Sequence, residues 1–460
     1  MQKSNLARRF FGAFFLISKY AIVIGMNRYA NCGKNSKYYA AVNYLESLGY
    51  SGSGYQRTNL RSYPRPTMFL ERMQDFLDSI GNPEIGFKYI HITGTAGKGS
   101  VAAAVHSALV RAEKRAGLFT SPFTISTIEK IQVGKRYIDP LIFADITEHL
   151  KPYVDKAIES GRHGIPSYFE LILAIALLYF KKEKCEYVVL EVGLGGRYDA
   201  TNIIEKPLVT AITNIALDHT NILGSRREDI ALDKSGIIKR DSIFFTTEEN
   251  PRILRIFKEA CMEVGAQYRS IHVRDFDYSG RNCMLAGSIC TELGIIRKPQ
   301  DIGHPPQLPA RFEIVERQPI VIIDGAHNPL KIESTIFNLK HLKYQKLVLV
   351  IAISSDKDWK TVIRLIAPYA DSIYVTRFSI PGRQSVGLDL LVKEARKHSR
   401  RSCLTYLYSD PIQAYNEARK CLTSKDALLV TGSFYLAGDI RSLYCSEDEI
   451  LKQRNSEIHN

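Results

Sequence analysis

The segment Tyr89–Val101 contains the residues that a phosphate-binding loop needs. An apolar, β-rich run ends in a turn of small residues, and an Ala/Val-rich helical pattern follows. In such a unit, glycines let backbone N–H groups approach phosphate oxygens, and the helix N-terminus favours negative charge. Lys98 can reach the outer phosphates, and the Ser100 hydroxyl can hold Mg²⁺. The unit predicts a nucleotide site, although Gly99 separates lysine from serine and breaks the strict GxxxxGK[ST] pattern.

Two further loops place polar side chains at the ends of apolar strands. The loop 193–202 contains three glycines together with Arg197 and Asp199, and the strand pattern over 208–215 leads to the pair Asp218–His219. Ligands of α/β folds bind at the carboxyl ends of the strands, so both loops are candidate site segments. An imidazole there can bind a metal ion while its neighbour orients it, or it can be an ordinary surface histidine.

Two charged residues have both a structural and a functional interpretation. Glu170 lies in the first turn of an apolar helix, where a carboxylate can satisfy the helix N-terminus or bind a metal ion. Lys234 lies among apolar residues in the segment 230–238, where a lysine can extend its amine from a helix face into solvent. The pattern alone leaves these alternatives open.

The composition is that of a soluble globular protein with two or three domains. The 460 residues are 45% hydrophobic and 24% charged, with a net charge of +14. Seven basic residues and no acidic one lie within residues 1–45, so half of the net charge belongs to this segment. The remaining excess suits small polyanionic ligands. No basic run with interleaved aromatic residues occurs, which argues against nucleic-acid binding.

The eight cysteines form no CxxC pair and no zinc-type spacing, so we expect reduced thiols and a cytoplasmic protein. The apolar run Phe10–Met26 is short for a membrane span, is interrupted by Lys19 and lacks a signal-peptide cleavage pattern, so neither a span nor a secretory signal is favoured. We interpret residues 1–25 as an upstream extension of the reading frame, with Met26 as the working start. A targeting peptide or a membrane anchor is the alternative.

Alternating strand and helix patterns predict an α/β fold with two domains. We expect a P-loop-type central domain with a parallel sheet over residues 36–296, and a smaller doubly wound α/β domain over residues 311–445. The segment 297–310 has four prolines and no apolar period, which is typical of an interdomain linker. Residues 1–35 and 446–460 then form an N-terminal extension and a C-terminal tail.

Taken together, these loops resemble the folylpolyglutamate synthase/dihydrofolate synthase family of the Mur ligase superfamily. The resemblance covers about residues 36–443, in consistent order. Its motifs are HITGTAGKGSV, TSPF, SYFE, EVGLGGRYDATNII, ITNIALDHTNILG, DKSGIIK, PARFE, IIDGAHNP, SDKD and VTGSFYLAGDIR. Membership implies a monomeric ATP-dependent amide ligase that adds L-glutamate to folate or dihydropteroate, with two Mg²⁺ ions and no nucleic-acid or membrane partner.

The resemblance also implies roles for individual residues. The phosphate loop would bind ATP through Gly94, Thr95, Gly97, Lys98, Gly99 and Ser100. Further ATP contacts would come from Asn214, Arg311, Asp324, His327 and Asn328. The metal ligands would be Ser100, Glu170, His219 and, as a carbamate, Lys234. The folate pocket would be lined by Thr120, Ser121, Pro122, Phe123, Arg197 and Asp199. The catalytic residues would be Lys98, Lys234, Arg311 and His327.

The implied chemistry suits these residues. A carboxylate must first attack the γ-phosphate of ATP to give an acyl phosphate, and cations would offset the charge that develops on the transferred group. The glutamate amine would then displace phosphate. Closure of the second domain would keep water away from the acyl phosphate.

Four residues depart from the family pattern: Ala96 replaces Asn, Phe123 replaces His, Ala310 replaces Gly and Asp233 replaces Glu. We expect the first and third to be tolerated, because the backbone and Lys98 carry the phosphate contact. Phe123 lies on the substrate side and leaves the acceptor carboxylate open. The alternatives are a Mur-type ligase for a different carboxylate and a nucleotide-binding protein without ligase activity. The retained motif residues argue against the second alternative.

Overall fold

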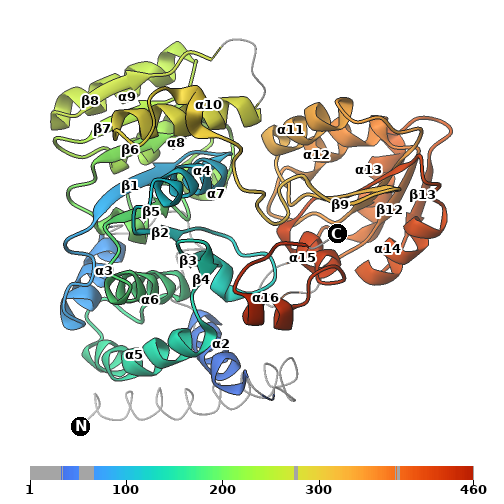
Figure 1. Cartoon of the computed structure of the whole chain (residues 1–460). Coiled ribbons are helices and arrows are strands. Elements are labelled where there is room, and N and C mark those ends of the chain that lie inside the picture. Colours follow the sequence, from blue (N-terminus) through green and yellow to red (C-terminus); the bar gives the residue numbers. More distant parts are fainter. Residues whose placement is uncertain are drawn as a thin grey trace, which may run out of the picture.

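The computed structural model describes residues 35–50, 67–273, 278–378 and 384–458, together with Gly33 and Ile380. These residues form two α/β domains, each built on its own sheet (Figure 1). The N-terminal extension predicted over residues 1–35 lies almost entirely outside the described residues. Among the helices of the described ranges, none combines the length and the apolar character that crossing a membrane requires.

The central domain contains an eight-stranded sheet with the strand order β4-β3-β2-β5-β1-β6-β7-β8. The strands are β1 (Lys88–Thr93), β2 (Ala116–Phe119), β3 (Ile131–Val133), β4 (Arg136–Tyr137), β5 (Tyr187–Glu191), β6 (Val209–Ile212), β7 (Ile243–Thr246) and β8 (Gln267–Ser270). Six strands are parallel, and β3 and β4 add an antiparallel hairpin at one edge. The sequence patterns did not reveal β8, because β8 has only exposed and half-buried side chains and lacks an apolar run.

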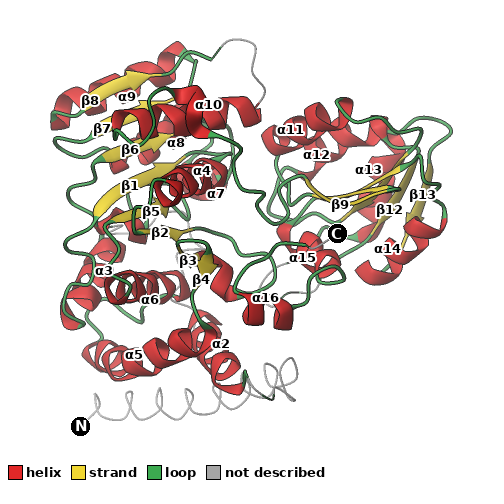
Figure 2. Cartoon of the chain, in the orientation of Figure 1, coloured by secondary structure: helices red, strands yellow, loops and turns green. Residues whose placement is uncertain are grey.

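Helices cover both faces of this sheet (Figure 2). Alternate side chains along β5 point to opposite faces, so Val189 joins a different apolar cluster from Val188 and Leu190. One face packs against α4 (Lys98–Arg111) and α10 (Tyr278–Glu292). The other face packs against α3 (Met68–Ser79), α6 (Tyr168–Lys182), α8 (Arg227–Lys234) and α9 (Pro251–Val264), and α2 (Ser36–Tyr50) and α5 (Pro140–Ser160) pack on α6. The short helix α7 spans Thr220–Leu223.

The C-terminal domain contains a six-stranded sheet with the order β13-β12-β11-β14-β10-β9. Its strands are β9 (Glu313–Arg317), β10 (Ile320–Ile323), β11 (Leu347–Ile351), β12 (Ser372–Val375), β13 (Leu404–Leu407) and β14 (Ala427–Thr431). Its helices are α11 (Pro329–Lys340), α12 (Trp359–Ile366) and α13 (Leu388–His398) on one face, and α14 (Pro411–Lys420) and α15 (Phe434–Arg441) on the other. The predicted doubly wound α/β fold is confirmed, with an antiparallel edge strand, β9, that the sequence did not reveal.

The linker and the tail are both structured. The linker contains a 3-10 turn, Pro299–Ile302, that packs on α10 and α4. The tail contains α16 (Glu447–Gln453), after which the chain returns to the central domain. There the backbone N–H of Tyr137 donates to the carbonyl of Arg454 over 2.8 Å, and the Ser456 hydroxyl donates to Glu129 over 3.0 Å. The two domains are therefore joined both by the linker and by the tail.

Candidate active site

The phosphate loop lies where β1 ends and α4 begins. Gly94 (φ 148°) and Gly97 (φ 83°) hold backbone conformations that favour glycine. A Cβ atom on Gly94 would lie 1.8 Å from Thr213 Oγ1, and one on Gly97 would lie 2.4 Å from Asn282 Oδ1. Only glycine fits at these two positions, so the loop keeps the open backbone that a phosphate group requires.

The loop after β6 holds the phosphate loop in shape. Asn214 accepts from the N–H of Ala96 over 3.0 Å and donates to its carbonyl over 3.1 Å. The Thr95 hydroxyl accepts from the N–H of Ala216 over 3.0 Å. Asn214 and Thr95, both predicted to touch the nucleotide, therefore also fix the loop itself. These contacts use the backbone of Ala96, which explains why an alanine can replace the usual asparagine.

Lys98 and Glu191 lie close enough together beside the phosphate loop for each to shift the pKa of the other. The Lys98 amine donates to the Gly94 carbonyl over 3.0 Å, and burial lowers its pKa while Glu191 and Asp218 act to raise it. Glu191, at the end of β5, accepts from the N–H of Ser121 over 2.9 Å and lies 3.1 Å from where a Cβ of Gly99 would be. Burial raises the pKa of Glu191, and Lys98 opposes that rise.

Glu170 does not take part in this arrangement, contrary to the prediction that it binds Mg²⁺ with Ser100. Arg72 of α3 donates to both carboxylate oxygens of Glu170. Its Nε atom lies 2.9 Å from Oε2, and its Nη2 atom lies 2.9 Å from Oε1. Glu170 also accepts from the N–H of Ser167 over 2.6 Å, which completes a capping box at the start of α6. The helix-cap interpretation was correct, and Arg72 adds a buried ion pair to it.

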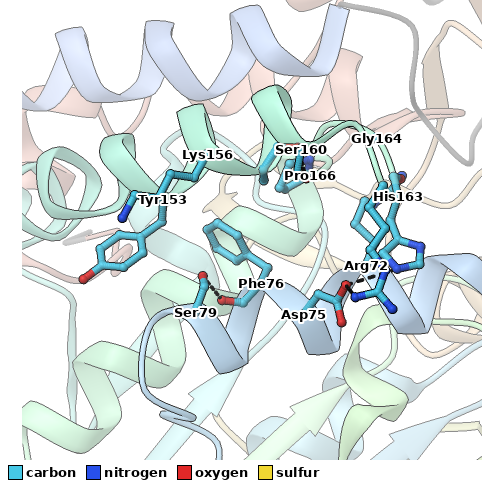
Figure 3. Close-up of a pocket in the computed structure, with 12 residues that line it drawn as sticks. Arg72, Asp75, Phe76, Ser79, Tyr153, Lys156, Ser160, His163, Gly164 and Pro166 are labelled. Atoms are coloured by element: carbon cyan, nitrogen blue, oxygen red, sulfur yellow. Dashed lines mark hydrogen bonds and ion pairs between the residues drawn. The ribbon is translucent and has the colours of Figure 1, made fainter.

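Arg72 lines a cavity of about 190 Å³ between α3, α5 and the loop before α6 (Figure 3). Its lining includes Asp75, Phe76, Tyr153 and His163, and none of the residues predicted for the nucleotide, metal or folate sites. This cavity is therefore separate from the phosphate loop.

The residues around the phosphate loop fit one Mg²⁺ ion that is also bound by phosphate. In the parts of the chain that the structure describes, no three acidic, histidine or cysteine side chains come close enough to hold a metal ion by themselves. Mg²⁺ in nucleotide sites takes one or two carboxylates, phosphate oxygens and water, so Glu191 and the Ser100 hydroxyl supply a suitable protein set. Glu191 lies beside the phosphate loop, whereas Glu170, the carboxylate predicted for this ion, is paired with Arg72.

His219 and Lys234 are the residues predicted for a second Mg²⁺ ion, and burial favours the uncharged form of both side chains. Burial lowers the pKa of His219 to about 3, so its imidazole is a neutral potential ligand. Burial and the charge of Lys98 lower the pKa of Lys234 to about 7, and its amine donates to the Gly195 carbonyl over 3.3 Å. A neutral amine is the form that reacts with CO₂, which suits the predicted carbamate.

The C-terminal domain contributes cations to the same region. The Arg311 guanidinium lies 3.9 Å above the centre of the Phe434 ring, and burial lowers its pKa while Glu191 and Asp324 oppose that fall. Asp324 accepts from the hydroxyl of Thr335 over 2.6 Å and from the N–H of Ala326 over 3.2 Å. Asp324 therefore shapes its own loop and provides a negative charge close to Arg311.

Asp218 connects the two domains beside the site. It accepts from the Lys357 amine over 2.8 Å and from the Asn328 side chain over 2.8 Å. Both donors belong to loops of the C-terminal domain: Lys357 lies before α12, and Asn328 lies at the start of α11. Asn328 also caps α11 by accepting from the N–H of Lys331 over 3.0 Å. The predicted loops of the second domain thus reach the central domain through Asp218.

Comparison with known proteins places this geometry in a family. The family model of the Mur ligase middle domain matches residues 92–276, and that of the Mur ligase glutamate ligase domain matches residues 310–434. The dihydrofolate synthase/folylpolyglutamate synthase of Bacillus subtilis is 30% identical over 412 residues, which cover 81% of this chain and 94% of that protein. This chain belongs to the dihydrofolate synthase/folylpolyglutamate synthase family.

Solved structures of the family share the fold over nearly the whole chain. Mycobacterium tuberculosis folylpolyglutamate synthase complexed with ADP superposes with a TM-score of 0.78 at 26% identity, and covers 88% of this chain and 98% of that one. E. coli FolC in complex with DHPP and ADP gives a TM-score of 0.72 at 26% identity, with coverage of 88% and 97%. The predicted family is confirmed.

A small cavity adjoins the phosphate loop in this family member. Its volume is about 40 Å³. The central domain contributes Gly99, Leu118, Thr120, Ser121, Pro122, Thr124, Glu129, Gln132, Tyr137 and Glu191 to its lining, and the linker region contributes Leu308, Pro309 and Arg311. Thr120, Ser121 and Pro122, three of the residues predicted for the folate pocket, therefore line the same cavity as Glu191 and Arg311.

The other predicted folate residues lie elsewhere. The ring of Phe123 is 5.1 Å from the Lys130 amine and does not line the cavity. Asp199 is buried and accepts from the backbone of Leu194 and Thr201, so it holds the 193–202 loop in shape. Arg197 is exposed, and its guanidinium donates to the carbonyl of Leu232. The structure does not bring these three side chains to the cavity.

Asn282 and Glu191 are two polar residues near the phosphate loop for which the sequence predicted no role. Asn282 stands in the first turns of α10 and reaches Gly97 across the domain. Glu191 ends an apolar strand, directly before the glycine loop. A charged residue that follows four apolar strand residues was an available signal, since strand ends carry the ligand-binding groups of α/β folds.

Proposed function

We propose that this protein is an ATP-dependent ligase that joins L-glutamate to a folate or to dihydropteroate. The observation that carries the proposal is the cavity in which the Thr120–Pro122 segment, Glu191 and Arg311 meet next to Lys98. An acceptor carboxylate in that cavity would lie beside the γ-phosphate of an ATP molecule held by the phosphate loop. Family membership supports the same activity, and the E. coli relative was solved with both DHPP and ADP.

In the first half-reaction, an oxygen of the acceptor carboxylate attacks the γ-phosphorus of ATP. The bond to the bridging oxygen breaks, and ADP leaves with its electron pair, which gives an acyl phosphate. Lys98 and Arg311 would offset the negative charge of the transferred group. Mg²⁺, held by Ser100 and Glu191, would supply further charge neutralisation when bound, and a second ion would be held by His219 and the carbamate of Lys234.

In the second half-reaction, the amine of L-glutamate attacks the acyl carbon. The carbon–oxygen bond to phosphate breaks, inorganic phosphate leaves, and the new amide nitrogen loses a proton. Water would compete with the amine, so the site must close. The contacts of Asp218 with Lys357 and Asn328 hold the second domain over the first and would contribute to this exclusion of water.

The first experiment is phosphate release from Mg-ATP and L-glutamate with dihydropteroate, with tetrahydrofolate and with no acceptor. Stimulation by dihydropteroate indicates the synthase step, and stimulation by tetrahydrofolate indicates chain extension. The Lys98→Ala variant is the control and should lose about 10²–10³-fold in turnover, the typical effect of removing one preorganised charge. ATP binding without stimulation by either acceptor would refute the proposal in favour of another carboxylate substrate.

We also infer a monomeric protein of the cytoplasm. The seven cysteines in the described ranges all have free thiols, as a reducing compartment requires. Sedimentation of the purified protein tests the oligomeric state directly.

A further inference from the structure

Lys331, in the first turn of α11, brings a positive charge toward the nucleotide site from the C-terminal domain. Its side chain is half-buried, and its amine lies 3.3 Å from Nε2 of His327 and 6.0 Å from the centre of the Phe434 ring. Arg311 lies over the same ring at 3.9 Å. Lys331 and Arg311 thus share one aromatic support in the second domain.

His327 orients this lysine. Its Nδ1 atom lies 2.8 Å from the Gly325 carbonyl, and because a carbonyl oxygen can only accept, Nδ1 carries the proton. Burial holds the pKa of His327 well below its usual value, so the ring is neutral and Nε2 is a free acceptor. The Lys331 amine donates to Nε2. The lysine is therefore held by a neutral base, and its charge is not cancelled by that contact.

The carboxylates around Lys331 already have other partners. Asp218 accepts from Lys357 and Asn328, and Glu191 accepts from the N–H of Ser121. Burial lowers the pKa of Lys331 to about 7, with Asp218 raising it and Lys98 and Arg311 lowering it further. Three cations, Lys98 at the start of α4, Arg311 at the start of the C-terminal domain and Lys331 of α11, thus lie close enough to repel one another. A polyanion between them would relieve that repulsion and restore the charge of the lysine.

We propose that Lys331 is a further catalytic residue, whose ammonium, oriented by His327, binds the phosphoryl group as it passes from ATP to the acceptor carboxylate. The inference rests on the proposed ligase function and deepens it. The lysine would act only by charge: no proton leaves it, and the bonds that form and break are those of the first half-reaction. Lys98 would bind the same group from the central domain, so transfer would require both domains to be in place.

The test isolates the first half-reaction. The enzyme is mixed with Mg-ATP and acceptor but no L-glutamate, and ADP formation is followed through the first turnover. Lys331→Met should lower that rate by about 10²-fold, as expected for the loss of one preorganised charge, and Lys331→Arg should keep most of it. Lys340→Met, at the exposed C-terminal end of the same helix, is the matched control and should behave like the unaltered protein.

Binding of ADP and the melting temperature show whether each variant is folded, and Lys331→Gln replaces the methionine variant if that one is not. A normal first turnover in Lys331→Met with a raised KM for L-glutamate would overturn the inference, because the lysine would then bind the glutamate carboxylate. A normal first turnover with unchanged KM would also overturn it. Failure of the unaltered protein to form ADP in response to any folate acceptor would overturn the proposed function and this inference together.

Discussion

The proposal that Glu191, rather than Glu170, helps to hold Mg²⁺ makes a prediction that separates stability from metal binding. We compare Glu170→Gln with Glu191→Gln, because each change removes one buried charge and keeps the shape of the side chain. Glu170 is bound by Arg72 of α3, and the two side chains are each 4% exposed. Glu191 has a backbone donor and faces Lys98, and burial raises its pKa.

The expected magnitudes differ in kind. Removal of one partner from a buried ion pair costs about 3–5 kcal/mol, because the other charge stays buried. The glutamine can still accept from Ser167, so we expect Glu170→Gln to lose about 3 kcal/mol, the lower end of that range. At about 2–4 °C per kcal/mol for a domain of this size, the melting temperature falls by roughly 6–12 °C. Glu191→Gln removes a carboxylate that burial already disfavours, so it should melt close to the unaltered protein.

Metal dependence should show the opposite pattern. Loss of a contact that supports a metal ligand typically lowers metal affinity by roughly 10–100-fold. In Glu191→Gln, the Mg²⁺ concentration that half-activates ATP turnover should rise by at least that factor. In Glu170→Gln, measured well below its melting temperature, that concentration should stay unchanged. A raised Mg²⁺ requirement in Glu170→Gln with unchanged melting would refute the reasoning, as would a normal requirement in Glu191→Gln.

Two further predictions concern Lys130 and Asp218. The Lys130 amine lies 4.5 Å from the Tyr168 ring centre, and burial lowers its pKa from 10.5 to about 7. Between these two pH values Lys130 binds more protons in the unfolded chain than in the folded one. The unaltered protein therefore gains stability as pH rises from 7 toward 10. Lys130→Met lacks this contribution, so its stability relative to the unaltered protein should fall over that pH range. Denaturant titration at several pH values measures this. If the difference in stability between the two proteins does not change with pH, the lowered pKa of Lys130 is contradicted. Asp218→Asn removes the ion pair with Lys357 and should weaken the contact between the domains by about 1.5–3 kcal/mol, the range for hydrogen bonds to charged groups. Small-angle X-ray scattering should then show a larger radius of gyration, and an unchanged one would mean that Asp218 does not hold the domains together.

The glycine loop and the strand–helix alternation were readable from the sequence because they depend on neighbours in the chain. Gly94 and Gly97 hold positive φ angles, and the apolar runs of β1, β5 and β6 are buried on both faces. Parallel strands of this kind give near-continuous apolar runs. The strands β8 and β9 could not be predicted in this way, because each lies at a sheet edge, where fewer side chains need to be apolar.

The sequence by itself determined the fold class, the nucleotide loop and the family, since period, turn residues and motif order are properties of short segments. The tertiary structure decided which partners each carboxylate has. Glu170 pairs with Arg72 across 98 positions of the chain. Glu191 comes close enough to Lys98 to affect its pKa, because β5 and β1 are neighbours in the sheet. Lys331 reaches the site only because the second domain packs over the first. A side chain's partner depends on which distant segments meet in the folded protein, and no local pattern contains that information.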